Sequence, residues 1–120
     1  MEDFDIIEFV ANKHGCEFSS EDDYYALLEG WSSAGRNWCL ELNAEDLINS
    51  MKENVEGYDV DYETYIWLDD FGHGGRGAPL SLREVLEDSE EIKQELETMY
   101  EEVSMIKECV GEYITKNVKE

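Results

Sequence analysis

The chain of 120 residues is 42% hydrophobic and 12% aromatic, which is enough apolar surface to fold around one core. Its 31 acidic side chains against 9 Lys and Arg give a formal charge of −22, and such a surface repels nucleic acids and anionic membranes. We therefore expect a single acidic domain over residues 1–120 that binds no nucleic acid directly and no membrane.

The N-terminal segment and the cysteines indicate a cytoplasmic protein, of a bacterium or of an infected host cell. Acids stand at Glu2, Asp3 and Asp5, where a secretory signal would carry Lys or Arg, and no apolar run approaches the ~20 residues that span a bilayer. The cysteine count is odd and no C-x-x-C spacing occurs, so we expect reduced, partly buried thiols. The cysteines are Cys16, Cys39 and Cys109.

The first predicted elements are a helix and a β-hairpin. Residues Asp3–His14 place apolar side chains at helical spacing, and Gly15 follows them as a stop signal. Residues Tyr24–Trp31 and Asn37–Leu42 have the alternation of strands, and the small and polar segment 32–36 between them predicts a turn. One face of the second predicted strand carries Trp38, Leu40 and Leu42, and the other carries Cys39 and Glu41.

A second helix is predicted to begin after Asn43 and to end before Gly57. Asn43 is a good N-cap residue, and the carboxylates of Glu45 and Asp46 suit the positive end of a helix dipole. The predicted inward stripe consists of Leu47, Ile48, Met51 and Val55.

The segment Tyr58–Leu68 fits two structures. Its aromatic and β-branched residues are typical of a strand. Asp61 as a cap, followed by Tyr62, Tyr65 and Ile66, fits a short helix instead. We favour the helix, and the strand stays open as the alternative.

The last third of the chain is predicted to be helical, because Ser81 and Glu84 have capping-box spacing and apolar residues then follow at heptad spacing. One unbroken helix over 81–117 would be roughly 55 Å long at about 1.5 Å per residue. We favour a break near Asp88-Ser89; a protruding helix would instead suggest a homodimer through it. The heptad residues are Ile92, Leu96, Met99, Val103, Ile106, Val110 and Tyr113. The expected fold class is α+β, a small antiparallel hairpin or sheet packed against several helices, the C-terminal one long.

Three patterns resemble ligand sites, but each lacks a requirement of the chemistry. Gly72, Gly74 and Gly77 have dinucleotide-site spacing, yet no buried strand precedes them and the nearby acids repel phosphate. The spacing of Asp59, Asp61, Glu63 and Asp70 resembles a calcium loop, but Thr64 replaces the glycine that permits its sharp turn. His14 and Cys16 lack the further ligands of a zinc site. We therefore predict no cofactor and no metal, and a protein that is not an enzyme.

The distributed carboxylates are the feature that points to a function. B-form DNA carries a charge about every 1.7 Å along its axis, and a folded acidic surface can offer a basic groove a comparable field. An aromatic side chain among such acids can also contact a protein that normally stacks bases. The predicted partner-binding residues are Glu21, Asp22, Asp23, Tyr24, Asp59, Asp61, Asp69, Asp70, Glu87, Asp88, Glu90 and Glu91.

In size, charge and distribution of acids the whole chain resembles the small acidic proteins of phages and mobile elements that mimic DNA. This resemblance, which includes no diagnostic motif, implies an inhibitor of the antirestriction or anti-CRISPR type whose partner is a basic nucleic-acid-binding protein, such as a nuclease. Two other hypotheses remain. The heptad face could bind a partner helix, as in a structural or regulatory interaction module, and Leu96→Asp or Val103→Asp would then abolish association. An unrecognised metal-carboxylate enzyme would bind metal stoichiometrically.

Overall fold

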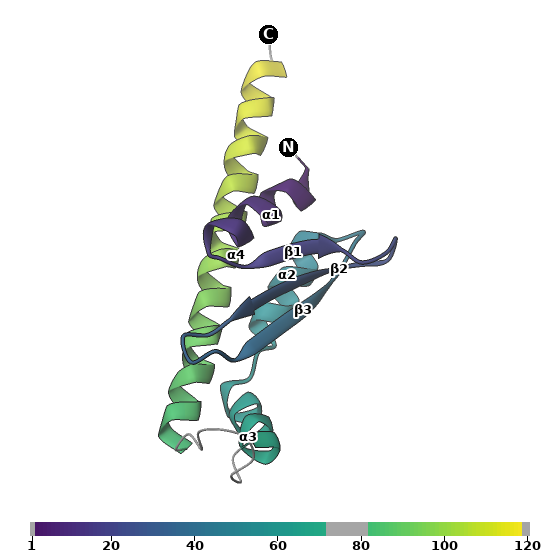
Figure 1. Cartoon of the computed structure of the whole chain (residues 1–120). Coiled ribbons are helices and arrows are strands. Elements are labelled where there is room, and N and C mark those ends of the chain that lie inside the picture. The colour runs from purple at the N-terminus through teal and green to yellow at the C-terminus, as the bar shows by residue number, and fades with distance from the viewer. Residues whose placement is uncertain (1, 72–81, 119–120) are drawn as a thin grey trace.

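The computed structural model describes residues 2–71 and 82–118 and has the predicted α+β fold. A three-stranded antiparallel sheet packs against helices, and the long C-terminal helix runs the length of the molecule (Figure 1). The elements in chain order are α1 (Asp3–Lys13), β1 (Glu17–Ser20), β2 (Tyr25–Trp31), β3 (Asn37–Asn43), α2 (Leu47–Glu56), α3 (Val60–Phe71) and α4 (Leu82–Val118).

The sheet has the order β1-β2-β3, so the predicted hairpin is confirmed and gains a first strand that the sequence pattern did not reveal. Strand β2 pairs with both neighbours, with Phe18 opposite Leu28 and Leu28 opposite Leu40. Alternation along β3 is as predicted, because Trp38 and Leu42 are buried while Cys39 and Glu41 are exposed. One face of the sheet therefore carries the core, and the other stays open.

Helices α1, α2 and α4 cover the buried face of the sheet. Helix α1 contacts β1, α2 contacts β3, and both lie against α4 (Figure 1). The most deeply buried side chains come from all of these elements, which makes one continuous core. Fully buried members include Ile6, Ile7, Leu28, Leu42, Met51, Ile92, Leu96, Met99 and Val103.

Helix α4 is unbroken over 37 residues, so the predicted break near Asp88-Ser89 is wrong. Both side chains at that point turn inward: Ser89 is fully buried, and its Oγ accepts a hydrogen bond of 2.9 Å from Arg36 Nη1. Ser89 is thus held by a tertiary contact within the helix rather than placed at a helix end. The last turns of α4 extend past α1 and the rest of the body (Figure 1).

Helix α2 starts later than predicted, and α3 starts earlier. Asp46, not Asn43, is the N-cap residue of α2, because Asn43 still belongs to β3 and its Oδ1 accepts a hydrogen bond from Glu45 N in the connecting turn. The helix over 58–68 is confirmed as α3, but its capping carboxylate is Asp59, which accepts hydrogen bonds from the N–H groups of Asp61 and Tyr62. Asp61 lies inside the helix.

All three cysteines are free, but only Cys16 is buried. Burial and the neighbouring Glu95 carboxylate raise the pKa of Cys16 to about 12. Cys39 and Cys109 are exposed, so the prediction of partly buried thiols is wrong for both. At Cys39 the reason is the strand period, since the buried neighbour Trp38 turns Cys39 to the open face. No helix in the described residues is long and apolar enough to cross a membrane.

Candidate protein-binding surface

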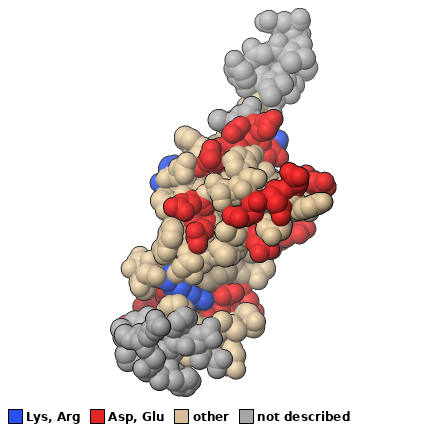
Figure 2. Space-filling model, turned by 45° about the vertical axis from the view of Figure 1, so that its right-hand side comes forward, with Lys and Arg blue, Asp and Glu red and all other residues tan. Residues whose placement is uncertain are grey.

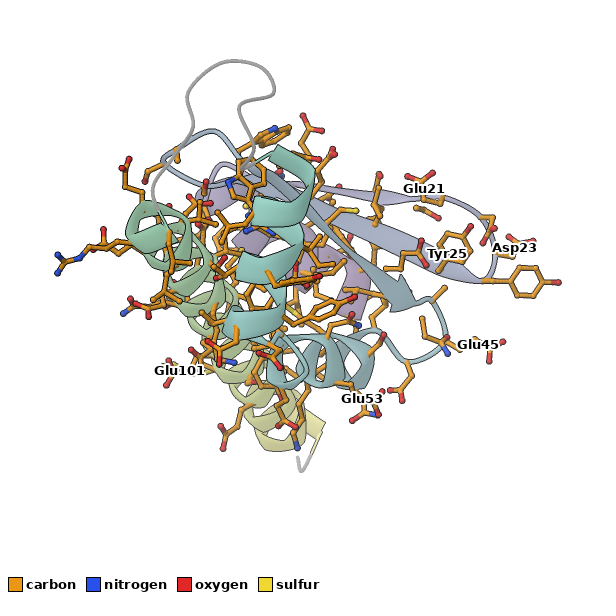
Figure 3. All side chains as sticks on the ribbon, turned by 90° about the horizontal axis from the view of Figure 1, so that it is seen from below. Glu21, Asp23, Tyr25, Glu45, Glu53 and Glu101 are labelled. Atoms are coloured by element: carbon orange, nitrogen blue, oxygen red, sulfur yellow. The ribbon has the colours of Figure 1, made fainter. Side chains whose placement is uncertain are left out.

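Two turns meet at one end of the sheet and bring five carboxylates together. The turn between β1 and β2 lies beside the turn between β3 and α2, and Ala44 N donates a hydrogen bond of 2.9 Å to Tyr24 O between them. Glu21, Asp23 and Tyr25 lie at this end, with Glu45 close by (Figure 3). We call this surface the acidic sheet end and define it as Glu21, Asp22, Asp23, Tyr24, Tyr25, Glu45 and Asp46.

The first of these turns is ordered by Asp22. Its Oδ1 accepts hydrogen bonds from Tyr24 N at 2.7 Å and from Tyr25 N at 3.1 Å, which is the local bonding by which Asp side chains stabilise turns. The pairing continues through Glu21 N, which donates to Tyr25 O at 3.2 Å. Because the backbone is held in this way, the Tyr24 side chain is presented outward and is 76% exposed.

The carboxylates of the acidic sheet end are exposed to solvent. Within the described part of the chain, none of the five forms an ion pair with Lys, Arg or His. Figure 2 shows acidic side chains gathered on the right of the molecule, the side that holds this end in Figure 1. Exposed like charges in one place repel one another, and salt screens that repulsion.

The open face of the sheet extends the same charge away from the turns. The three strands contain no Lys or Arg. Glu17 lies directly opposite Glu29 across β1 and β2, an arrangement of like charges that is destabilising. Glu41 is exposed on β3, and Trp31, at the far end of β2, is 46% exposed. The open face thus combines carboxylates with exposed aromatic rings.

The remaining predicted residues lie just before α3, on α3 and on the first turns of α4, away from the acidic sheet end (Figure 1). Several serve the fold: Asp59 caps α3, Glu91 accepts a hydrogen bond of 2.7 Å from Ser33 N, and Glu87 pairs with Arg83 at 3.4 Å. Asp61 and Glu90 are exposed. The side chains of Asp69 and Asp70 lie outside the described set.

Asp88 is only 6% exposed, so the prediction that it faces a partner is wrong. It lies one residue before Ser89 on the side of α4 that faces the body, where the helix periodicity carries it inward. The predicted partner-binding residues therefore divide between two regions, and only Glu21, Asp22, Asp23 and Tyr24 belong to the acidic sheet end.

A buried arginine organises the region that the other acids occupy. Arg36 is 8% exposed; besides Ser89, its guanidinium donates to Glu63 O at 3.2 Å and to Glu63 Oε2 at 3.3 Å. It also lies over the ring of Trp67, 4.9 Å from the centroid. These contacts join the hairpin turn to α3 and α4.

Two of the three ligand-like patterns lie in the described residues, and neither has the geometry of a ligand site there. Asp59 and Asp61 lie at the start of a regular helix, which cannot wrap a calcium ion as a loop does. His14 Nε2 lies 3.0 Å from Glu102 Oε1, while Cys16 lies near Glu95. No group of three or more His, Cys, Asp or Glu in the described residues could hold a metal ion. Gly72, Gly74 and Gly77 lie outside the described residues.

Comparison with known protein families, with curated proteins and with solved structures gave no match. The site is therefore defined by its own geometry. Sequence reasoning identified the four residues at 21–24 but missed Glu45 and Asp46, which it assigned only to a helix start. It also missed Glu17 and Glu29, although the alternation of β2 already places Glu29 on the same face as Tyr25.

Proposed function

We propose that this protein is an inhibitor that binds a basic nucleic-acid-binding protein, of the restriction or CRISPR nuclease type, and occupies the groove in which that protein holds nucleic acid. The acidic sheet end is the contact surface, and the open face of the sheet extends it. The observation that carries the proposal is the set of five exposed carboxylates on two joined turns, none of them ion-paired within the described residues.

The fixed backbone of the first turn favours a role of these acids in binding over a role in solubility alone. Hydrogen bonds from Tyr24 N and Tyr25 N to Asp22 fix the first turn before any partner arrives, so less conformational entropy is lost on association. Tyr24 adds an exposed ring among the acids, which suits stacking on an arginine of a nucleic-acid site. Binding of this kind is fast, weakened by salt and competitive with DNA.

The alternative hypothesis is a module that binds through the heptad face of α4, but most of that face is not exposed to a partner. Ile92, Leu96, Met99 and Val103 are 0 to 1% exposed because they form part of the protein's own core. Leu96→Asp would therefore unfold the chain rather than abolish an association. A homodimer through the end of α4 remains an expectation that sedimentation can test.

The proposal is tested by affinity capture from a bacterial lysate at low and high salt. The protein should recover a basic nucleic-acid enzyme at low salt only, and duplex DNA should displace it. The triple variant Glu21→Lys, Asp23→Lys, Glu45→Lys should lose capture, while Asp22 is kept because it orders the turn. The matched control Glu90→Lys, Glu97→Lys, Glu101→Lys changes the net charge equally at exposed positions on α4. Equal loss in both variants would contradict a defined binding surface.

A further inference from the structure

A hollow of about 380 Å³ opens beside the acidic sheet end. Four parts of the fold line it: the start of α1, the paired residues Ser20 and Ala26 of β1 and β2, the turn before α2, and α4 at Lys107. These parts are distant in sequence, so the hollow exists only in the folded chain. It shares Glu45 with the acidic sheet end and lies next to Glu21 and Tyr25 along the strands.

The lining divides into an apolar floor and a carboxylate rim. Phe4, Ala26 and Leu47 supply the floor, and the last two are 2% and 7% exposed. The charged lining groups are the carboxylates of Glu2, Asp3 and Glu45 and the ammonium of Lys107. Lys107 Nζ is already bound to Asp3 Oδ1 at 2.7 Å, which leaves two carboxylates of the rim without a cation among the described residues.

The charge of the hollow favours a cation over an anion. Helices α1 and α2 both begin near it, and neither N-cap side chain, Glu2 or Asp46, makes a capping hydrogen bond. Each helix start contributes about +0.5 of a charge. The three lining carboxylates outweigh Lys107 and the two helix starts, so the lining groups have a negative sum of charges. Glu21 and Asp46 add to this charge, because each follows a lining residue directly in the chain.

We propose that this hollow receives an arginine side chain of the partner, an inference that rests on the proposed function. The methylene stem of an arginine can lie on the apolar floor while its guanidinium reaches the rim. A planar fork of N–H donors matches a carboxylate such as Glu45 better than an ammonium does. The hollow thus anchors one cationic residue, and the exposed carboxylates around it supply the long-range attraction.

A labelled octa-arginine peptide, with an octa-lysine peptide for comparison, tests the inference by fluorescence anisotropy. Ala44→Leu fills the hollow from the turn before α2 and leaves every charge in place. It should weaken octa-arginine binding about tenfold, as loss of an anchor contact does, and affect octa-lysine less. Ala34→Leu, at an exposed position of the β2–β3 turn, should change neither.

A second pair of variants tests whether the hollow receives an arginine if Ala44→Leu does not fold. Glu45→Gln should weaken octa-arginine binding more than Glu101→Gln, which removes the same charge on α4 (Figure 3). If plugging the hollow or neutralising Glu45 has no more effect than its control, the arginine anchor is overturned while the acidic surface stands. If the Glu21, Asp23 and Glu45 triple reversal also leaves lysate capture unchanged, the proposed function fails as well. Saturable NMR shifts of Phe4, Ala26 and Leu47 with inorganic phosphate would make the hollow an anion site and overturn the inference.

Discussion

Two regions of this protein are rich in acids and use them in opposite ways. Around Arg36, the carboxylate of Glu63 faces a buried guanidinium, and Glu91 and Asp59 accept backbone hydrogen bonds that join or start secondary structures. At the acidic sheet end, only Asp22 has such a role in the turn. The other carboxylates there are exposed and unpaired with cations of the described chain.

The difference separates acids that hold the fold from acids available to a partner. Net charge alone cannot make this separation, because both regions are acidic in sequence. Like charges that repel in the free protein are destabilising, and a basic partner relieves that repulsion when it binds. Stability measurements should therefore respond in opposite directions to charge changes in the two regions.

The largest expected effect comes from the Arg36 region. Arg36→Ala should destabilise the protein by about 3 kcal/mol, because it removes bonds to Ser89 and Glu63 and leaves buried polar groups unpaired. Urea unfolding followed by circular dichroism gives the change. Arg83→Ala is the control, since the Arg83–Glu87 pair is exposed and should contribute less than about 0.5 kcal/mol.

A smaller effect of opposite sign is expected on the open face of the sheet. Glu17→Lys places a cation opposite Glu29 and should stabilise the protein by about 0.5 to 1 kcal/mol, more at low salt than at high salt. Glu41→Lys makes the same change of net charge but faces Leu27, so it isolates the cross-strand term. A gain in urea midpoint that is equal for both variants would show that only total charge matters and would remove the contrast between the two regions.

The sequence predicted those elements whose cause is local. The apolar periodicity of α1 and the alternation of β2 and β3 lie within single segments, and these elements were predicted correctly. Strand β1 was missed because only Phe18 among its four residues is buried, so its stability depends on pairing with β2. At the point in α4 where a break was predicted, Ser89 is buried and bonded to Arg36, which is 53 positions away in the chain.

Of the candidate site, too, only the part that depends on local sequence was predicted. Glu21, Asp22 and Asp23 are consecutive, and their clustering was visible in the sequence. That Glu45 lies beside them follows from the hydrogen bond between Ala44 and Tyr24, a tertiary contact that no local pattern shows. The prediction that Asp88 faces a partner failed for the converse reason. Its neighbours in sequence are acidic, but its side chain is buried in the folded protein.

The smallest expected effect concerns Glu102, an acid of α4 that is paired with Lys13 and His14. Its carboxylate lies 3.0 Å from both Lys13 Nζ and His14 Nε2, and hydrogen bonds from these two groups lower the pKa of Glu102 below its ordinary value of 4.5. A lowered folded pKa means that the contribution to stability is present above the unfolded value and is lost as pH falls through the folded one. The free energy of unfolding of the wild type should therefore exceed that of Glu102→Gln by about 0.2 to 0.5 kcal/mol at pH 7. The urea midpoints of the two proteins should converge in acid.

The control is Glu101→Gln, at an exposed neighbour without an ion pair in the described residues, and its stability should follow that of the wild type at every pH. If the difference in stability between wild type and Glu102→Gln persisted in acid, Glu102 would act through packing and not through its charge. Ion pairing of carboxylates would then not distinguish the body of the protein from the acidic sheet end.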